Sequence, residues 1–139
     1  MKGYFNNEQA NKDSFCGDWF RTGDVVVTDA DGEIYIVDRI KDMIKVKGYQ
    51  VSPTELEDEI RLAPGVADVA VIGVPHPQSG EAPRAFIVPR SAEVSAESIQ
   101  EFLTGRLARY KQLTGGIVIT ESLPKSPTGK VLRKELRNL

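Results

Sequence analysis

The sequence predicts an α+β fold, in which helices pack on a small mixed β-sheet that is preceded by a β-hairpin. Two observations favour this class. Short runs rich in β-branched residues alternate with segments whose apolar residues recur at helical spacing, and serines stand at two expected helix N-caps, Ser52 and Ser95. The chain has 139 residues, 40% of them hydrophobic and 27% charged, which is enough to bury a core.

The N-terminal part is expected to hold little regular structure apart from one hairpin. Residues 1–23 are polar and glycine-dotted, and they predict irregular chain or one short helix around residues 7–14. Residues 25–28 and 33–37 are rich in valine, isoleucine and tyrosine, and a turn-forming tetrapeptide that ends at Gly32 joins them. This combination predicts the hairpin.

Residues 38–42 interrupt the apolar pattern and mark a candidate domain boundary, after which residues 43–51 predict a short strand, a glycine-marked turn and a second extended segment. Ser52, Pro53 and Glu55 form a capping box with proline at the first helical position, and they predict the start of a helix. The residues expected on its apolar stripe are Leu56, Ile60 and Ala63, and those expected on its exposed face are Glu55, Glu57, Asp58 and Glu59.

The remaining segments complete the sheet and its helices. Residues 66–74 and 83–89 predict two core strands that pair, with a loop over residues 75–82. Ser95 caps a second helix, residues 117–120 predict another strand, and a last helix follows the loop over residues 121–130. The apolar residues expected to face inward from these two helices are Ile99, Phe102, Leu103, Leu107 and Tyr110, and Val131, Leu132, Leu136 and Leu139.

Composition excludes several classes of function. The net charge of -2, with both signs interspersed, gives no support to nucleic-acid or anionic-membrane binding. Cys16 and His76 are the single cysteine and histidine, so no zinc-type metal site is predicted, and His76 between two prolines is expected to be a surface residue rather than a base. No apolar run approaches the roughly 20 residues of a transmembrane helix. We expect an intracellular location, with cytoplasmic, peroxisomal and mitochondrial compartments not distinguished.

Three polar stretches, residues 21–24, 38–48 and 124–130, contain the candidate functional residues. Asp24 could accept hydrogen bonds from two neighbouring hydroxyls, as a ribose offers them, although a turn-capping role is the simpler alternative. Arg39 can bind oxygen atoms in a bidentate manner. These two side chains are therefore candidate nucleotide ligands.

The second stretch also contains Lys41, Lys45 and Lys47, followed by Gly48. Strand alternation would put Lys45 and Lys47 on one side, where lysine also serves to protect an edge strand from unwanted pairing. Gly48 permits close approach of a ligand to the backbone.

The third stretch presents Lys130 on a glycine-containing loop flanked by prolines. It is not a phosphate-binding P-loop, because the earlier glycine and the following Ser/Thr of that motif are missing. Two interpretations of Lys130 are open. It is either a mobile cation that acts at a site formed by another part of the molecule, or an exposed lysine at the start of a helix.

Taken together and in this order, the stretches resemble the C-terminal part of the adenylate-forming enzymes, which include acyl-CoA synthetases, coumarate-CoA ligases, beetle luciferases and the adenylation domains of peptide synthetases. The motifs that carry the resemblance are Trp19-Phe20-Arg21-Thr22-Gly23-Asp24, Asp38-Arg39-x-Lys41-x-x-Ile44-Lys45-x-x-Gly48-Tyr49-Gln50-Val51-x-Pro53-x-Glu55-Leu56-Glu57, and Pro124-Lys125-Ser126-Pro127-Thr128-Gly129-Lys130-Val131-Leu132-Arg133. The resemblance spans nearly the whole chain and favours the coumarate-CoA ligase, luciferase and acyl-CoA ligase branch.

The resemblance implies two parts. Residues 1–40 would be the tail end of a large N-terminal AMP-binding domain, including the hairpin, and residues 41–139 would be the mobile C-terminal lid domain. The nucleotide-gripping loop and the acyl pocket of the family lie upstream, so the chain is not expected to be active alone. The implied partners are its own N-terminal domain, a carboxylic acid, ATP or AMP, and CoA, with Mg²⁺ held mainly by the missing domain.

The resemblance also implies residue roles in an AMP-forming acid-thiol ligase. Lys130 would act in acyl-AMP formation, and Asp24 and Arg39 would hold the ribose hydroxyls. Lys41, where many relatives carry Asp, would be the hinge about which the lid turns. Lys45 would act in thioester formation, and Lys47, Gly48 and Tyr49 would line the passage for CoA or pantetheine. The alternatives are an adenylation domain that loads a pantetheine carrier, and a non-catalytic α+β interaction module.

Overall fold

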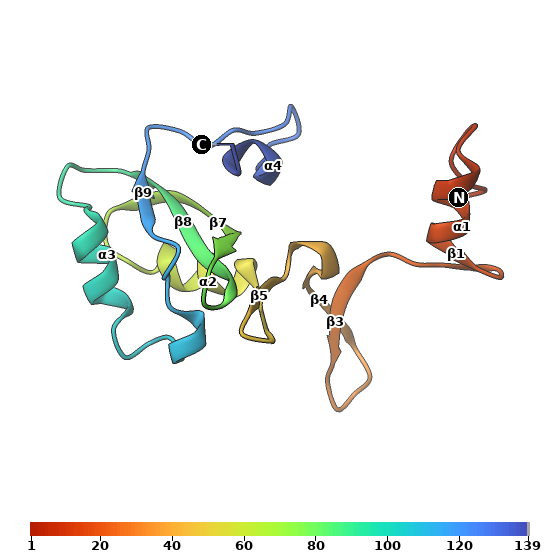
Figure 1. The fold of residues 1–139 in the computed structure, drawn as a ribbon, viewed down its shortest axis with the longest axis horizontal. Coiled ribbons are helices and arrows are strands. Elements are labelled where there is room, and N and C mark those ends of the chain that lie inside the picture. The colour runs from red at the N-terminus through yellow and green to blue at the C-terminus, as the bar shows by residue number, and fades with distance from the viewer. Residues whose placement is uncertain (139) are drawn as a thin grey trace. The chain divides into compact units, whose positions relative to one another are not determined.

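The computed structural model describes residues 1–138 and divides the chain into two compact units, Met1–Lys41 and Asp42–Leu139 (Figure 1). The smaller unit contains the predicted short helix, α1 (Glu8–Ser14), whose N-cap Asn7 accepts a hydrogen bond from the amide of Ala10. Two short strands, β1 (Phe15–Cys16) and β2 (Trp19–Phe20), follow it and pair with each other.

The predicted hairpin is confirmed as the antiparallel pair β3 (Asp24–Thr28) and β4 (Ile34–Arg39). Asp29 orders its turn, because the carboxylate accepts hydrogen bonds from the amides of Glu33 and Asp31 and from the hydroxyl of Tyr35. The hydrogen bond from Glu33 is the largest cause that holds the pKa of Asp29 below its ordinary value. β4 continues through Asp38 and Arg39, so it ends two residues later than the strand expected over residues 33–37. A 3₁₀ turn, η1 (Ile40–Asp42), follows β4.

The larger unit is a mixed sheet with helices packed on it, as predicted, and the helices cover both of its faces. Its elements are β5 (Ile44–Val46), β6 (Tyr49–Val51), α2 (Pro53–Arg61), β7 (Val66–His76), β8 (Gly80–Pro89), α3 (Ala96–Leu103), the 3₁₀ turn η2 (Arg109–Lys111), β9 (Ile117–Ile119) and α4 (Arg133–Leu136). The sheet order is β6-β5-β8-β7, and β9 pairs in parallel with β8 while the other pairs are antiparallel. β7 therefore forms one edge of the sheet.

Both faces of the β7–β8 pair are buried, which explains why these strands read as nearly continuous apolar runs. Side chains that include Val69, Val71 and Ile87 pack against α2 and α3 in the larger cluster. Ala70, Ile72 and Phe86, which alternate with them, pack with Leu123 and Leu136 in the smaller cluster on the opposite face. The α4 segment thus covers the face opposite to α2 and α3 (Figure 1).

Three boundaries differ from the prediction. β7 extends to His76 and β8 begins at Gly80, so the expected loop over residues 75–82 shrinks to residues 77–79. α3 ends at Leu103, because Thr104 is extended and Gly105 has a left-handed φ of 79°; Leu107 and Tyr110 lie beyond the helix. They still pack against the larger cluster.

The last helix is also shorter than predicted. α4 covers only Arg133–Leu136, so Val131 and Leu132 precede it, and Leu139 lies outside the described residues. Val131 packs against the smaller cluster and Leu136 is buried in it. The apolar anchoring expected of the helix is therefore supplied partly by the chain before it.

Candidate functional site

Asp24 and Arg39, the predicted nucleotide ligands, lie opposite each other in the register of the β3–β4 hairpin. Arg39 Nε lies 2.9 Å from Asp24 Oδ1, and an Arg39 terminal nitrogen donates to the carbonyl of Thr22 at 2.8 Å. Together with Thr22 and Gly23 they line an open hollow of the smaller unit. The hairpin thus places a carboxylate and a guanidinium side by side, where both could contact adjacent hydroxyls.

Lys47 and Gly48 form the two-residue turn between β5 and β6, with φ values of 50° and 86°. A positive φ at both central residues is typical of a type I′ hairpin turn. The expectation that Lys45 and Lys47 share one side of a strand is therefore wrong: Lys45 lies in β5, and Lys47 lies in the turn. Among the described residues, no heavy atom beyond the two chain neighbours lies within 4 Å of the position that a Cβ on Gly48 would take, so the backbone of Gly48 is open to approach.

The turn is held by the neighbouring β7–β8 connection. The amide of Lys47 donates to the carbonyl of Ser79 at 2.8 Å, and the amide of Lys45 donates to the carboxylate of Glu81 at 2.7 Å. Tyr49 stacks on Tyr110 with ring centroids 4.4 Å apart, although it remains 57% exposed. Tyr110 is expected from the sequence on the helix that Ser95 caps, and its contact with Tyr49 has no local signal in the sequence.

We expect the turn to respond oppositely to two substitutions. Gly48→Ala should lower the free energy of unfolding by about 1–2 kcal/mol, because a residue with a Cβ is disfavoured at the positive φ. Lys47→Asn should raise it by up to about 0.5 kcal/mol, because asparagine tolerates this region better than lysine. Urea unfolding of both variants checks the pair, and equal stabilities would contradict the turn geometry.

The Lys130 loop, residues 125–133, is folded back on itself. The amide of Ser126 donates to the carbonyl of Lys130 at 2.8 Å, and the amide of Lys130 donates to Ser126 Oγ at 3.2 Å. Lys125 and Val131 form an isolated antiparallel bridge at its base. Gly129, with a φ of 82°, closes the turn. Lys130 therefore lies on the returning arm of an ordered hairpin-like loop, next to the bridge at its base.

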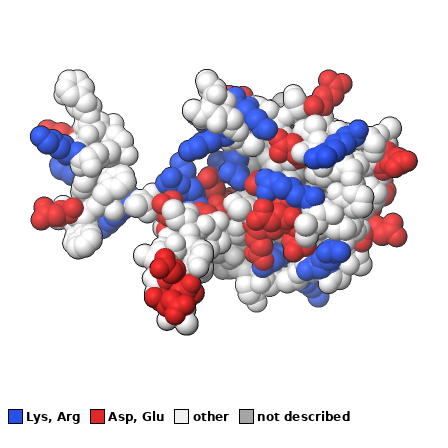
Figure 2. Space-filling view, turned by 180° about the vertical axis from the view of Figure 1, so that it is seen from behind, with Lys and Arg blue, Asp and Glu red and all other residues white. Residues whose placement is uncertain are grey.

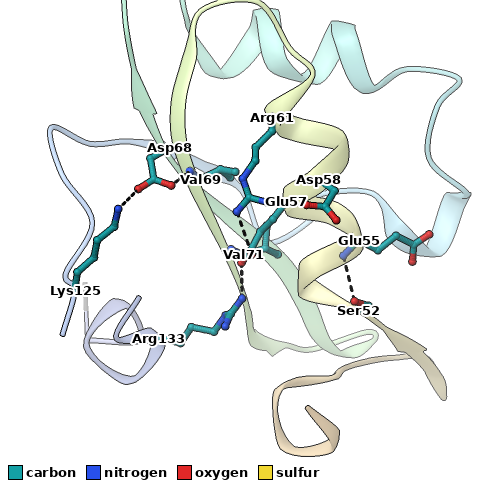
Figure 3. Close-up of polar contacts among 10 residues, drawn as sticks. All are labelled: Ser52, Glu55, Glu57, Asp58, Arg61, Asp68, Val69, Val71, Lys125 and Arg133. Carbon is teal, nitrogen blue, oxygen red and sulfur yellow. Dashed lines mark hydrogen bonds and ion pairs between the residues drawn. The ribbon is translucent and has the colours of Figure 1, made fainter. Parts of the chain in front are cut away.

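Glu57 corrects the expectation of a fully exposed acidic face on α2. Its side chain is only 7% exposed, and its Oε1 accepts from the amide of Val71 at 2.9 Å and from Arg133 at 2.7 Å (Figure 3). Glu55, Asp58 and Glu59 do lie toward solvent, where they pair with Lys111, Arg61 and Arg106. Glu57 thus connects α2 to the edge of β7 and to the Lys130 loop.

The candidate lysines are available to a ligand. Lys45, Lys47 and Lys130 are exposed, and within residues 1–138 no hydrogen bond or ion pair involves their ammonium groups. Lys41, the predicted hinge, is exposed within η1. Figure 2 shows Lys and Arg side chains interspersed with Asp and Glu rather than gathered in one basic field, which agrees with the small net charge.

The single histidine and the single cysteine lie apart from the candidate residues in the sequence. His76 ends β7, and its Nδ1 lies 2.9 Å from the hydroxyl of Ser79, which donates to the carbonyl of Glu81. Cys16 is a free, exposed thiol. In the described part of the chain no three His, Cys, Asp or Glu side chains are grouped so as to hold a metal ion. No helix among these residues is long and apolar enough to cross a membrane.

The larger unit is a small α+β domain, and the ammonium groups of Lys47 and Lys130 on its ordered turns have no hydrogen-bond or ion-pair partner within residues 1–138. The family model for the AMP-binding enzyme C-terminal domain matches residues 55–130, and the chain belongs to this family. The similarity extends beyond the matched segment. 4-Coumarate–CoA ligase 1 from Arabidopsis thaliana is 42% identical over 139 residues, which are 99% of this chain and 25% of that protein.

Two solved structures superpose over nearly the whole chain. ATP-bound MatB from Rhodopseudomonas palustris is 35% identical, with a TM-score of 0.90 over 99% of this chain and 27% of that chain. The o-succinylbenzoate CoA synthetase MenE from Bacillus subtilis, in complex with the acyl-adenylate intermediate OSB-AMP, is 34% identical, with a TM-score of 0.90 over 100% of this chain and 28% of that chain. The chain spans about a quarter of the length of the curated relatives it matches.

Proposed function

We propose that this chain is the C-terminal part of an AMP-forming acyl-CoA synthetase, and that the whole protein joins a carboxylic acid to CoA through an acyl-AMP intermediate. The single observation that carries the proposal is an exposed Lys130 on a self-closed loop, whose ammonium has no hydrogen-bond or ion-pair partner within residues 1–138, in a chain of this family. A CoA ligase among the relatives, and structures bound to ATP or an acyl-adenylate among the similar proteins, support the reaction class.

In the first half-reaction, the substrate carboxylate attacks the α-phosphorus of ATP, the bond to pyrophosphate breaks, and acyl-AMP forms. Such displacements depend on positioning and on electrostatic stabilisation of the oxygens rather than on proton transfer. Lys130 would bridge the carboxylate and the α-phosphate, because its ammonium is not engaged by any side chain in residues 1–138. Asp24 and Arg39 would bind the ribose hydroxyls in both half-reactions.

In the second half-reaction, the CoA thiol attacks the acyl carbon and AMP leaves. Residues 41–139 would turn about Lys41 as a mobile lid, while residues 1–40 would stay with the preceding AMP-binding domain. Lys45 would then act at the acyl-AMP, and Lys47, Gly48 and Tyr49 would border the pantetheine arm. The open space around Gly48 and the exposed ring of Tyr49 suit an extended chain that passes along the turn.

The described residues do not fit a Mg²⁺ site of their own. Within residues 1–138 no three His, Cys, Asp or Glu side chains are grouped so as to hold a metal ion without a substrate. An ion that accompanies ATP would be held mainly by the phosphates and by the preceding domain, and none of the roles above depends on it.

The proposal is tested by measuring acid-dependent ATP–pyrophosphate exchange with the whole protein and then adding CoA to the accumulated acyl-AMP. We expect exchange only with a suitable carboxylic acid, and AMP and an acyl-CoA thioester after CoA is added. A panel of aliphatic and aromatic acids is needed, because the acyl pocket lies outside this chain. Absence of exchange with every acid, together with binding to a protein partner, would instead favour the interaction module.

A further inference from the structure

The Lys130 loop is attached to the sheet by an ion pair on each side. At its start, Lys125 Nζ lies 2.6 Å from the carboxylate of Asp68 in β7. At its end, Arg133 lies 2.7 Å from Glu57 Oε1 in α2 (Figure 3). The two acids thus contact cationic residues that lie five positions before and three positions after Lys130 in the sequence.

Glu57 is the more buried of the two acids, at 7% exposed against 29% for Asp68. A buried carboxylate is stable only with compensating donors, and Glu57 has the amide of Val71 and the guanidinium of Arg133, with Arg61 3.7 Å away. Val71 belongs to the edge strand β7, so the carboxylate also satisfies an outward-facing amide of that edge. The second pair is more exposed, with Lys125 44% and Asp68 29% accessible.

The two ion pairs orient the Lys130 loop, whereas apolar contacts attach it to the sheet. Leu123 and Leu136 are buried in the smaller core cluster, and Val131 packs against it, so apolar burial already holds the segment to the sheet. Such contacts are non-directional. The hydrogen bond from Arg133 to Glu57 is directional. Arg133 Nε is buried and has no hydrogen-bond partner within residues 1–138.

We propose that Glu57 and Asp68 are positioning residues for Lys130, which fix the orientation of its loop through Arg133 and Lys125. The internal hydrogen bonds of the loop make it a rigid extension, so a shift at either anchor moves the ammonium of Lys130. This inference rests on the proposed function. It predicts a selective loss of acyl-AMP formation, because only that half-reaction uses Lys130.

The test uses Glu57→Gln in the whole protein, with Glu59→Gln as the matched control on the same helix. Glu59 is 37% exposed and lies 3.9 Å from Arg106, so the control makes the same chemical change away from the Lys130 loop. We expect Glu57→Gln to slow acid-dependent exchange roughly ten- to a hundredfold, since small misplacements of a charge have effects of that size. Thioester formation from supplied acyl-AMP should stay within about twofold, as should both activities of the control.

The Lys130→Ala background separates positioning from general damage to the fold. There Glu57→Gln should cause no further loss of exchange, because the group that it positions is already gone. A further loss of the same size, an equal loss in both half-reactions, or unchanged exchange in the single variant would overturn the positioning role. If Glu57→Gln does not fold, Arg133→Lys and Asp68→Asn decide the question by the same selective loss or its absence.

Failure of this inference is distinguishable from failure of the proposed function. A whole protein without acid-dependent exchange, or one in which Lys130→Ala exchanges normally, contradicts the proposed function itself. A protein in which Lys130→Ala is slow but Glu57→Gln, Arg133→Lys and Asp68→Asn are normal contradicts only the positioning role.

Discussion

Lys130→Ala in the whole protein is expected to slow acyl-AMP formation by roughly a hundred- to a thousandfold, which is the usual effect of removing one preorganised charge contact from a transition state. The ammonium would neutralise the carboxylate and the α-phosphate as they approach, and two anions that meet without it repel each other. Single-turnover formation of acyl-AMP measures the effect, and supplied acyl-AMP with CoA measures the second half-reaction, which should change far less.

Lys134→Ala is the matched control for this variant. Lys134 is also exposed, lies four residues further on in α4, and has no ion pair within residues 1–138. We expect its acyl-AMP formation to stay close to that of the unmodified protein, within about 0.5 kcal/mol in barrier height. Unchanged acyl-AMP formation in Lys130→Ala, or equal losses in the two lysine variants, would contradict the assigned role.

Lys41→Pro is expected to slow thioester formation about a hundredfold while acyl-AMP formation is largely kept. Lys41 lies in the short 3₁₀ turn η1, at the last residue of the smaller compact unit. Proline fixes φ near -65° and restricts the preceding residue, so the backbone could no longer change its torsion angles as a hinge must. Stopped-flow measurement of each half-reaction tests the prediction.

Lys41→Ala provides the comparison that isolates the backbone effect. It removes the same side chain but leaves φ free, so it should lose much less thioester formation than Lys41→Pro. Equal losses in the two variants would assign the effect to the ammonium group instead. An equal loss of both half-reactions in Lys41→Pro would contradict a hinge at this position.

The sequence predicted those parts of the fold that depend on local chemistry. Ser52 and Ser95 cap helices as expected, since a hydroxyl that accepts from amides at a helix start is a local interaction. The paired strands β7 and β8 were predicted because nearly continuous runs of apolar, β-branched residues are typical of strands that are buried on both faces. Their facing ends are wrong: a loop was expected over residues 75–82, but β7 continues through Pro75 to His76, and β8 begins at Gly80 rather than at Pro83.

The parts that could not be predicted depend on contacts between distant residues. Glu57 looks like any acid on an exposed helix face, and its burial follows from the edge of β7 and from Arg133, 76 positions away in the chain. Lys47 fits strand alternation, but its left-handed φ arises from the two-residue turn that joins β5 to β6. The resemblance of the motifs indicated the candidate lysines. The contacts that orient them join residues distant in the sequence, so only the three-dimensional structure identifies these contacts.

The β3–β4 hairpin determines how the isolated chain should behave in solution. Ile34, Tyr35, Ile36 and Val27 are each more than half exposed, at 67%, 54%, 71% and 54%. A two-stranded ribbon without a covered apolar face is marginally stable in water, and its open edges can pair with other chains. Preparations of this chain alone should therefore tend to self-associate through that ribbon, and charged substitutions on its strands should improve colloidal stability without altering the larger unit.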